Sequence, residues 1–178
     1  LDKYREEQYR EVVKSELENQ LKTLHLDYVD AYLFHSARYA FNEAALEALG
    51  FVTQVGLAKK VGVSVYDPEE AKACFMNPYV NFLQAPYSIF DHRMKEAGVF
   101  EKEAYGDCEI HTRSAFIQGL IALNPEQIPP FLSKAEPIVK KIDKICSENG
   151  YNRVELAMAY IKKEEAITHL VFGVDSLE

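Results

Sequence analysis

Hydrogen-bonding and titratable side chains follow five short apolar stretches of the chain, each at the point where the stretch ends. They are His35 and Ser36, Ser64, Gln84 and Tyr87, Arg113 and Ser114, and Asp175 and Ser176. Taken singly, each has an ordinary explanation: a histidine can cap a loop, an amide can bond a neighbouring strand, and an arginine can form a salt bridge. If the stretches are parallel strands, their carboxyl ends meet on one rim, where the chemistry of such folds gathers. Together these side chains predict a ligand-binding site on that rim.

The segments that must position these residues alternate between two kinds of pattern. Residues 4–24 repeat apolar side chains at three- and four-residue steps, which is typical of an amphipathic helix. Residues 28–34 are nearly all apolar or aromatic, as expected of a parallel strand covered on both faces. The same reasoning predicts strands at 60–65, 80–84, 108–114 and 168–172, and helices at 43–49 (running on towards 54), from 67 onward, and at 94–104, 133–147 and 152–163.

Two of the predicted helices have clear starting signals. Asp67 suits a helix N-cap and Pro68 the first turn. Asn152 and Glu155 have the spacing of a capping box. In the helix at 133–147 we expect one face to carry Ile138, Ile142 and Ile145.

Alternating strands and helices with short connections predict an α/β fold with five parallel strands. Two architectures fit this pattern: an open doubly wound sheet, or part of a (β/α)8 TIM barrel. No Gly-x-Gly-x-x-Gly follows the first predicted strand, so the ordinary dinucleotide-binding fold lacks its main signature.

The composition excludes several classes of partner. Of the 178 residues, 48% are hydrophobic, and 28 acidic against 20 basic side chains give a formal net charge of −8. That is enough for one packed core. Nucleic acid and anionic membrane surfaces both require clustered Lys and Arg, so we expect neither as a partner. The apolar runs are far shorter than a membrane span, and the chain opens on charged residues rather than on a signal peptide.

The cysteines and histidines give weaker signals. Cys74, Cys108 and Cys146 are odd in number and widely spaced, which suits a reducing cytoplasm. No two of them share metal-ligand spacing, so we expect no metal site. His111 shares a strand face with Arg113 by parity, and we expect it to line the interior below that residue, whereas His169 has no obvious partner.

Five segments, in order along the chain, carry a family resemblance. They are 26–35 (LDYVDAYLFH), 60–69 (KVGVSVYDPE), 81–91 (NFLQAPYSIFD), 111–120 (HTRSAFIQGL) and 171–178 (VFGVDSLE). These segments resemble the fourth to eighth strands of the aldo-keto reductase barrel. The resemblance implies a (β/α)8 barrel that binds NADP(H) without a dinucleotide-binding fold and reduces the carbonyl groups of small molecules.

The resemblance also implies roles for the residues on the predicted rim. His35 would donate a hydrogen bond to the substrate carbonyl oxygen as charge develops there. Ser64 and Gln84 would hold the nicotinamide carboxamide. Arg113 stands where an aromatic ring often stacks on nicotinamide, and Ser114 could reach the cofactor phosphates. Asp175 and Ser176 match a loop near the 2′-phosphate end.

The departures from the family pattern lead to further expectations. Val65 stands where the family often has Asn. The family's first three strands, and with them its catalytic Asp, Tyr and Lys, have no match. We therefore expect residues 1–178 to form one incomplete barrel domain that is inactive by itself. Exposed barrel edges would favour self-association.

Two other interpretations remain open at this point. The chain could be a non-catalytic nicotinamide-cofactor-binding module, or a regulatory subunit of the same fold. An unrelated barrel enzyme or open α/β domain would require all five segment matches to be coincidental.

Overall fold

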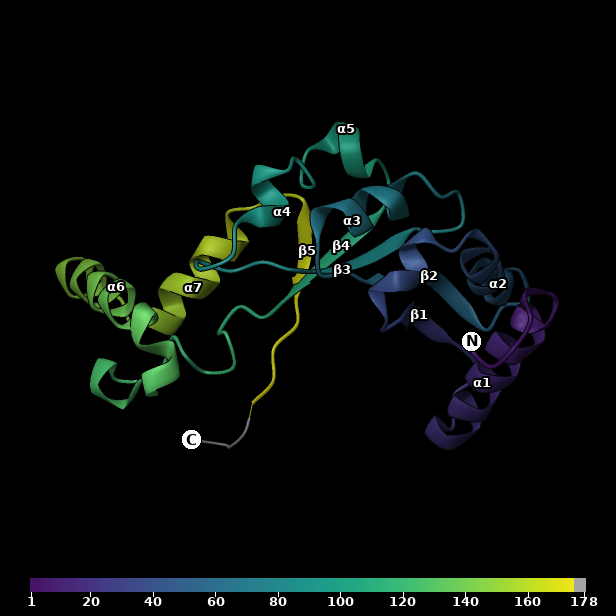
Figure 1. The fold of residues 1–178 in the computed structure, drawn as a ribbon, viewed down its shortest axis with the longest axis horizontal. Helices are drawn as coiled ribbons and strands as arrows, with labels where there is room; N and C mark the ends of the chain where they lie inside the picture. Colours follow the sequence, from purple (N-terminus) through teal and green to yellow (C-terminus); the bar gives the residue numbers. More distant parts are fainter. Residues whose placement is uncertain (175–178) are drawn as a thin grey trace.

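The computed structural model describes residues 1–174, so the predicted site residues Asp175 and Ser176 lie outside the described residues. Five parallel strands form one sheet in the order in which they follow along the chain (Figure 1). The strands are β1 (Val29–Phe34), β2 (Ala58–Ser64), β3 (Phe82–Pro86), β4 (Glu109–Arg113) and β5 (Ile167–Leu170). The expected α/β fold, with the strand order of a partial (β/α)8 barrel, is confirmed.

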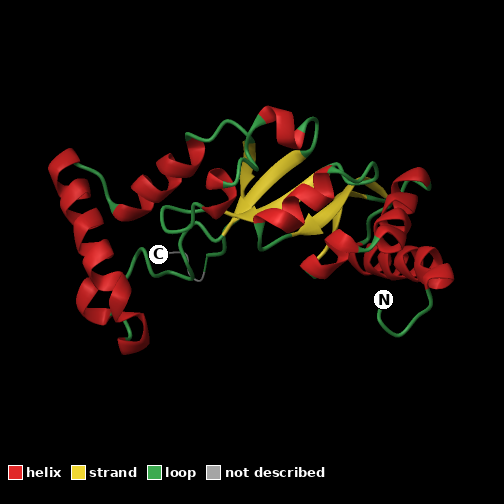
Figure 2. Cartoon of the chain, turned by 45° about the horizontal axis from the view of Figure 1, so that its top comes forward, coloured by secondary structure: helices red, strands yellow, loops and turns green. Residues whose placement is uncertain are grey.

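Helices separate the strands. The α-helices are α1 (Tyr9–Leu24), α2 (Glu43–Gln54), α3 (Pro68–Phe75), α4 (Arg93–Glu96), α5 (Lys102–Tyr105), α6 (Glu136–Asn149) and α7 (Arg153–Lys162). Short 3-10 helices η1 (Glu6–Gln8), η2 (Ala37–Phe41), η3 (Pro125–Gln127) and η4 (Pro130–Ala135) lie in the connections. The molecule is elongated, with α1 and α2 at one end and α6 at the other (Figures 1 and 2).

The sheet has two chemically different faces, because side chains alternate along each strand. One face carries Val61, Val63, Leu83 and Ile110, all fully buried in apolar clusters. The opposite face carries polar side chains: Lys60 and Ser64 on β2, Gln84 on β3, and Glu109, His111 and Arg113 on β4. We call this second face the inner face, since it corresponds to the interior of a closed barrel.

The structure corrects three details of the predicted elements. The helix expected at 94–104 is two short helices, α4 and α5, because Gly98 between them has a φ of +75° that no helix continues through. The third strand begins two residues later than expected, at Phe82. The side chains of β1 are mostly half-buried, whereas we expected this strand to be covered on both faces.

The helix expected at 133–147 differs in both its start and its buried face. It begins at Glu136, with Pro137 in the first turn, where a missing N–H is tolerated. Its buried residues are Val139, Ile142 and Cys146, whereas Ile138 and Ile145 are exposed. Ile142 is therefore buried as predicted, whereas the other two buried residues each lie one position after the predicted ones.

The helix starts at Asp67 and Asn152 are confirmed. Glu70 accepts from the backbone N–H of Asp67, and Asn152 exchanges hydrogen bonds of 2.8 Å in each direction with Glu155. Within residues 1–174, no helix is long and apolar enough to cross a membrane.

Candidate functional site

Three of the predicted site residues form one hydrogen-bonded group at the carboxyl ends of neighbouring strands. Ser64 and Gln84 are direct partners in the register of β2 and β3. The Ser64 hydroxyl donates to Gln84 Oε1 at 3.1 Å. From β4, Arg113 Nε donates to the same hydroxyl at 3.4 Å. The parallel register thus places an alcohol, an amide and a guanidinium side by side on the inner face.

The Arg113 guanidinium is held by three further contacts. Nη2 donates to the backbone oxygen of Val65 at 2.8 Å, and Nη1 donates to Ser114 Oγ at 3.4 Å. The guanidinium carbon lies 4.3 Å from the centre of the Tyr66 ring, a cation–π distance. These contacts fix the plane of the guanidinium, which leaves Arg113 as a preorganised flat cation at the rim.

Tyr66 was missed by sequence reasoning. Tyr66 is 44% exposed and lies two residues after the buried end of β2. The available signal was an aromatic residue two positions after Ser64, adjacent to a predicted strand end. Val65, which stands where the resemblance suggested an amide, points into the apolar core, and only its backbone groups bond to Gln84 and Arg113.

His35 lies beside this group but is not bonded to it. In the register of β1 and β2, His35 and Ser64 each follow the paired residues Phe34 and Val63. The imidazole is exposed and makes no hydrogen bond to any residue that the structure describes. The structure thus places His35 at the same rim, with its ring open to solvent.

A hollow of about 730 Å³ adjoins the Arg113 end of the group. Its lining includes Arg113, Ser114, Phe116 and Phe172, and the last two rings meet edge to face at 5.5 Å. The loop that borders it is backbone-strained: Ser114, Ile117 and Gln118 all have positive φ, at 66°, 46° and 51°. Strained backbone conformations of this kind cluster at active sites and ligand-binding segments. The strain therefore supports a ligand-binding role for this loop.

Tyr87, which the sequence placed on the rim, is not there. It is 1% exposed and lies on the opposite face, with Phe100 edge-on at 5.0 Å and Tyr160 stacked at 5.4 Å. Burial is the main cause that raises the pKa of its phenol. Tyr87 is therefore a core residue, because its position has the parity of Leu83 rather than that of Gln84.

A second polar cluster lies lower on the inner face. His111 lies below Arg113, as expected, with Nε2 at 2.7 Å from Glu109 Oε1. Lys60 pairs with the other carboxylate oxygen, and this hydrogen bond is the largest cause that lowers the pKa of Glu109. Burial lowers the pKa of His111, although its bond to Glu109 opposes the shift. The His169 ring lies 4.4 Å from that of His111.

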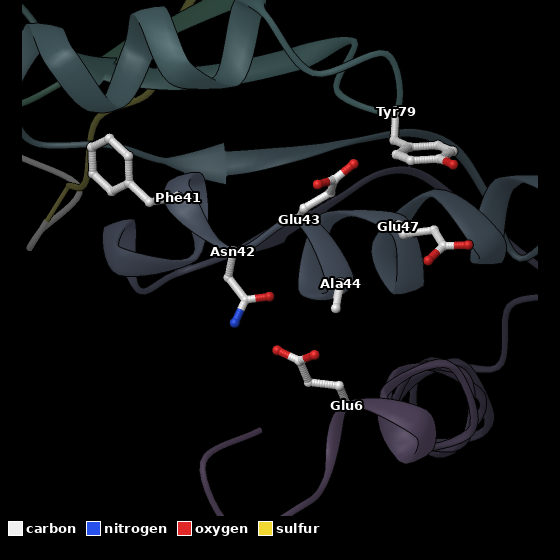
Figure 3. A pocket seen from close by; sticks show the side chains of 7 residues that line it. All are labelled: Glu6, Phe41, Asn42, Glu43, Ala44, Glu47 and Tyr79. Atoms are coloured by element: carbon white, nitrogen blue, oxygen red, sulfur yellow. The ribbon is translucent and has the colours of Figure 1, made fainter.

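Another hollow, of about 430 Å³, lies at the start of α2 (Figure 3). Glu6, Glu43 and Glu47 make it acidic, and Asn42 and Tyr79 complete much of its wall (Figure 3). None of the predicted site residues lines it. Its carboxylates give no reason to place the chemistry there.

Comparisons with known proteins agree with this architecture. The fold matches an aldo-keto reductase from Bacillus halodurans in its apo form, with a TM-score of 0.77 and 20% identity over 94% of this chain. It also matches a glycerol dehydrogenase from Gluconobacter oxydans, with a TM-score of 0.67 and 16% identity over 89% of this chain. The chain spans 59% and 53% of the lengths of those two proteins.

Sequence comparison gives the family. A search of curated protein sequences finds no match. The model of the aldo/keto reductase family matches residues 2–178. This match covers nearly the whole chain, and it agrees with both the strand order and the structural neighbours. The chain belongs to the aldo/keto reductase family.

Proposed function

We propose that this chain forms the nicotinamide-binding rim of an NADP(H)-dependent oxidoreductase that reduces aldehydes or ketones to alcohols. Family membership supports oxidoreductase chemistry with a small-molecule substrate and a nicotinamide cofactor. The observation that carries the proposal is the group of Ser64, Gln84 and Arg113 on the inner face. These residues come from three separate strands, and each was predicted to contact the cofactor.

The group has the donors that a nicotinamide carboxamide requires. Gln84 Oε1 accepts a hydrogen bond from the Ser64 hydroxyl, whereas Gln84 Nε2 has no hydrogen-bond partner among the described residues. That N–H₂ group is thus left to donate to the carboxamide oxygen. The bound cofactor supplies the hydride, and the task of Ser64 and Gln84 is to fix which ring face is presented.

Arg113 and Ser114 extend the proposed site towards the phosphates. The guanidinium stacks on Tyr66 and has a planar face suited to packing on nicotinamide. Ser114 lines the adjoining hollow of about 730 Å³. A cation and a hydroxyl beside that hollow favour a phosphorylated ligand, and the preference for NADP over NAD rests on the family resemblance.

His35 is the proposed catalytic residue of this chain. Its exposed imidazole at the rim would donate a hydrogen bond to a carbonyl oxygen on which negative charge develops. Since the family's catalytic Asp, Tyr and Lys have no match in these residues, we propose that the chain by itself gives no useful turnover. We also propose that residues 1–178 act as one domain.

Two properties of the surroundings are part of the same proposal. The strands β1 and β5 each pair with one neighbour only among the described strands, and such edges favour self-association. The thiols of Cys74, Cys108 and Cys146 are all free, which supports a cytoplasmic location.

Cofactor binding by the chain tests the proposal. NADPH is titrated into the protein, and the change in its fluorescence gives the dissociation constant. Replacing Gln84→Ala should weaken binding by about 5-fold, the equivalent of roughly 1 kcal/mol for one hydrogen bond. Gln127→Ala is the matched control, because Gln127 is exposed and lies in η3, away from the rim.

If the wild type, Gln84→Ala and Gln127→Ala bind NADPH with equal affinity, Gln84 does not contact the cofactor and the proposed site is wrong. Consumption of NADPH with a reactive aldehyde, abolished in His35→Ala, would overturn the proposed inactivity. Tight NADPH binding that persists without turnover in the complete protein would instead favour a non-catalytic module.

A further inference from the structure

The lower cluster on the inner face has the composition of a metal site. Glu109 and His111 on β4 and His169 on β5 each offer one ligand atom, and the three atoms lie within 4.8 Å of one another. We propose that Glu109, His111 and His169 bind a divalent transition-metal ion, with Zn²⁺ as the best match. This site is separate from the proposed cofactor site and does not depend on it.

An irregularity in the sheet places the third ligand. Ile110 pairs with Ile167, so a regular ladder would pair His111 with Thr168. The register shifts between Ile110 and His111, and His169 becomes the partner of His111 instead. One extra residue reverses the side on which a side chain points, so the shift turns His169 onto the inner face.

The displaced residue is itself held in place. Thr168 Oγ1 donates to the backbone oxygen of Ile110 at 3.1 Å, and His169 Nδ1 lies 3.2 Å from the same hydroxyl. Bulges are frequent beside functional sites, where they re-aim one side chain. The register shift therefore brings His169 next to His111, in addition to interrupting the short strand.

The carboxylate presents one oxygen to both imidazoles. Glu109 Oε1 lies 2.7 Å from His111 Nε2 and 3.9 Å from His169 Nδ1. Its other oxygen is bonded to Lys60. Lys60 thus acts as a positioning residue, in the way that hydrogen bonds outside the ligand set orient metal ligands.

The surroundings fix one imidazole and leave the other accessible. The Phe82 ring meets His111 at 4.4 Å and an angle of 66°, which restricts the histidine ring. The His169 side chain is 66% exposed, so an ion can enter from solvent and the ring can adjust to it. The Glu109–His111 pair is thus preformed, and the third ligand, His169, is exposed beside it.

The donor set selects the class of ion. Two imidazoles and one carboxylate are ligands that Zn²⁺ accepts, and three protein ligands leave its fourth position for water. Ca²⁺ and Mg²⁺ prefer oxygen ligands throughout, which one carboxylate cannot supply. The prediction of no metal site considered only cysteine spacing, and could not foresee ligands that lie 58 residues apart, on β4 and β5.

Direct zinc binding tests this proposal. The untagged chain is freed of metal with EDTA, dialysed, and titrated with ZnCl₂ by calorimetry, and Co²⁺ absorption reports the coordination geometry. We expect one Zn²⁺ per chain at micromolar affinity or tighter, and a tetrahedral Co²⁺ spectrum. His169→Ala and Glu109→Gln should each weaken binding by at least about 10-fold.

The control is His25→Asn, which removes an exposed histidine at a left-handed position that Asn tolerates. It should leave zinc binding unchanged. Since His169 is exposed, His169→Ala should keep the wild-type circular dichroism spectrum without metal. Absence of zinc binding up to millimolar concentration, or equal binding by wild type and His169→Ala, would overturn the proposal whether or not NADPH binds.

Discussion

The Ser64 hydroxyl donates to Gln84 Oε1 at 3.1 Å, and the two residues are direct partners in a parallel register. This pairing commits the amide oxygen of Gln84 to the protein and leaves its N–H₂ group without a hydrogen-bond partner among the described residues. The orientation of Gln84 therefore depends on a residue of the neighbouring strand.

Ser64→Ala should lower the free energy of unfolding by about 1 kcal/mol, because it removes the hydroxyl that donates to Gln84 and accepts from Arg113. Urea unfolding followed by circular dichroism measures the change. Ser133→Ala is the matched control, since Ser133 is exposed in η4. Equal unfolding midpoints for the two variants would show that the hydrogen bonds of Ser64 contribute nothing.

Gly62→Ala should destabilise the sheet by on the order of 3 kcal/mol, as expected for severe overpacking. A Cβ on Gly62 would overlap the backbone oxygen of Phe82 on the neighbouring strand. Thermal unfolding measures the effect. Gly173→Ala should be close to neutral, because nothing lies within 4 Å of the added atom. A Gly62→Ala protein as stable as Gly173→Ala would contradict the close approach of β2 and β3.

Asn152→Ala should cost about 1 kcal/mol, because the Asn152 side chain accepts from the Glu155 N–H at the start of α7. Asn124→Ala serves as the comparison, since Asn124 occupies the N-cap position of η3 without a side-chain bond. Denaturant unfolding of both variants measures the difference. Equal stability would mean that this capping box does not stabilise α7.

Lowering the pH should reduce the free energy of unfolding, in part because Asp91 becomes protonated and loses its ion pair with Arg93. The Arg93 guanidinium lowers the pKa of Asp91 below its ordinary value of 3.8. Because the pKa is lower in the folded state, the stabilisation is present above the unfolded-state pKa and is lost as pH falls through the folded-state pKa. The contribution is less than about 1 kcal/mol, since Arg93 is half-exposed.

Urea midpoints measured from pH 7 down to pH 2 test the role of Asp91. Asp91→Asn should be less stable than wild type at pH 7, and the difference should shrink in acid. Asp27→Asn should match wild type throughout, because Asp27 is exposed and forms no ion pair with any residue that the structure describes. A constant difference between Asp91→Asn and wild type at every pH would contradict the linkage.

The thiols should be unreactive in the folded chain. Burial raises the pKa of Cys74 and of Cys108 to about 12, and Cys146 is 4% exposed. A disulfide exchange reagent at pH 8 should therefore label the native protein slowly and label all three cysteines at once in denaturant. Rapid stoichiometric labelling without denaturant would show that the apolar core opens readily.

The sequence predicted the fold well because its signals were local. Apolar runs such as 28–34 and cap residues such as Asn152 determine elements with little help from distant contacts. Helix faces were harder: Ile138 and Ile145 are exposed, whereas Val139 and Cys146 pack inward beside Ile142. The apolar residues of this helix define two neighbouring faces that share Ile142, and only packing against the rest of the fold decides which face is buried.

The site was predictable in part for the same reason. Position at the end of a predicted strand gave Ser64, Gln84 and Arg113, which the register brings together. It gave the wrong environment for Tyr87, which has the parity of the core face. The inward position of His169 could not be predicted, because a register shift decides it, and the shift depends on how two strands pair.

We propose above that the strand ends around Gln84 and Arg113 contact a nicotinamide cofactor. The most direct measurement is a titration of the ¹⁵N-labelled chain with NADP⁺, following the side-chain resonances of these residues by NMR. We expect the Gln84 N–H₂ and Arg113 Nε–H signals to shift and saturate together, while the side-chain signals of Gln127 stay unchanged. Saturable shifts confined to residues away from the rim, or no shifts at all, would contradict it.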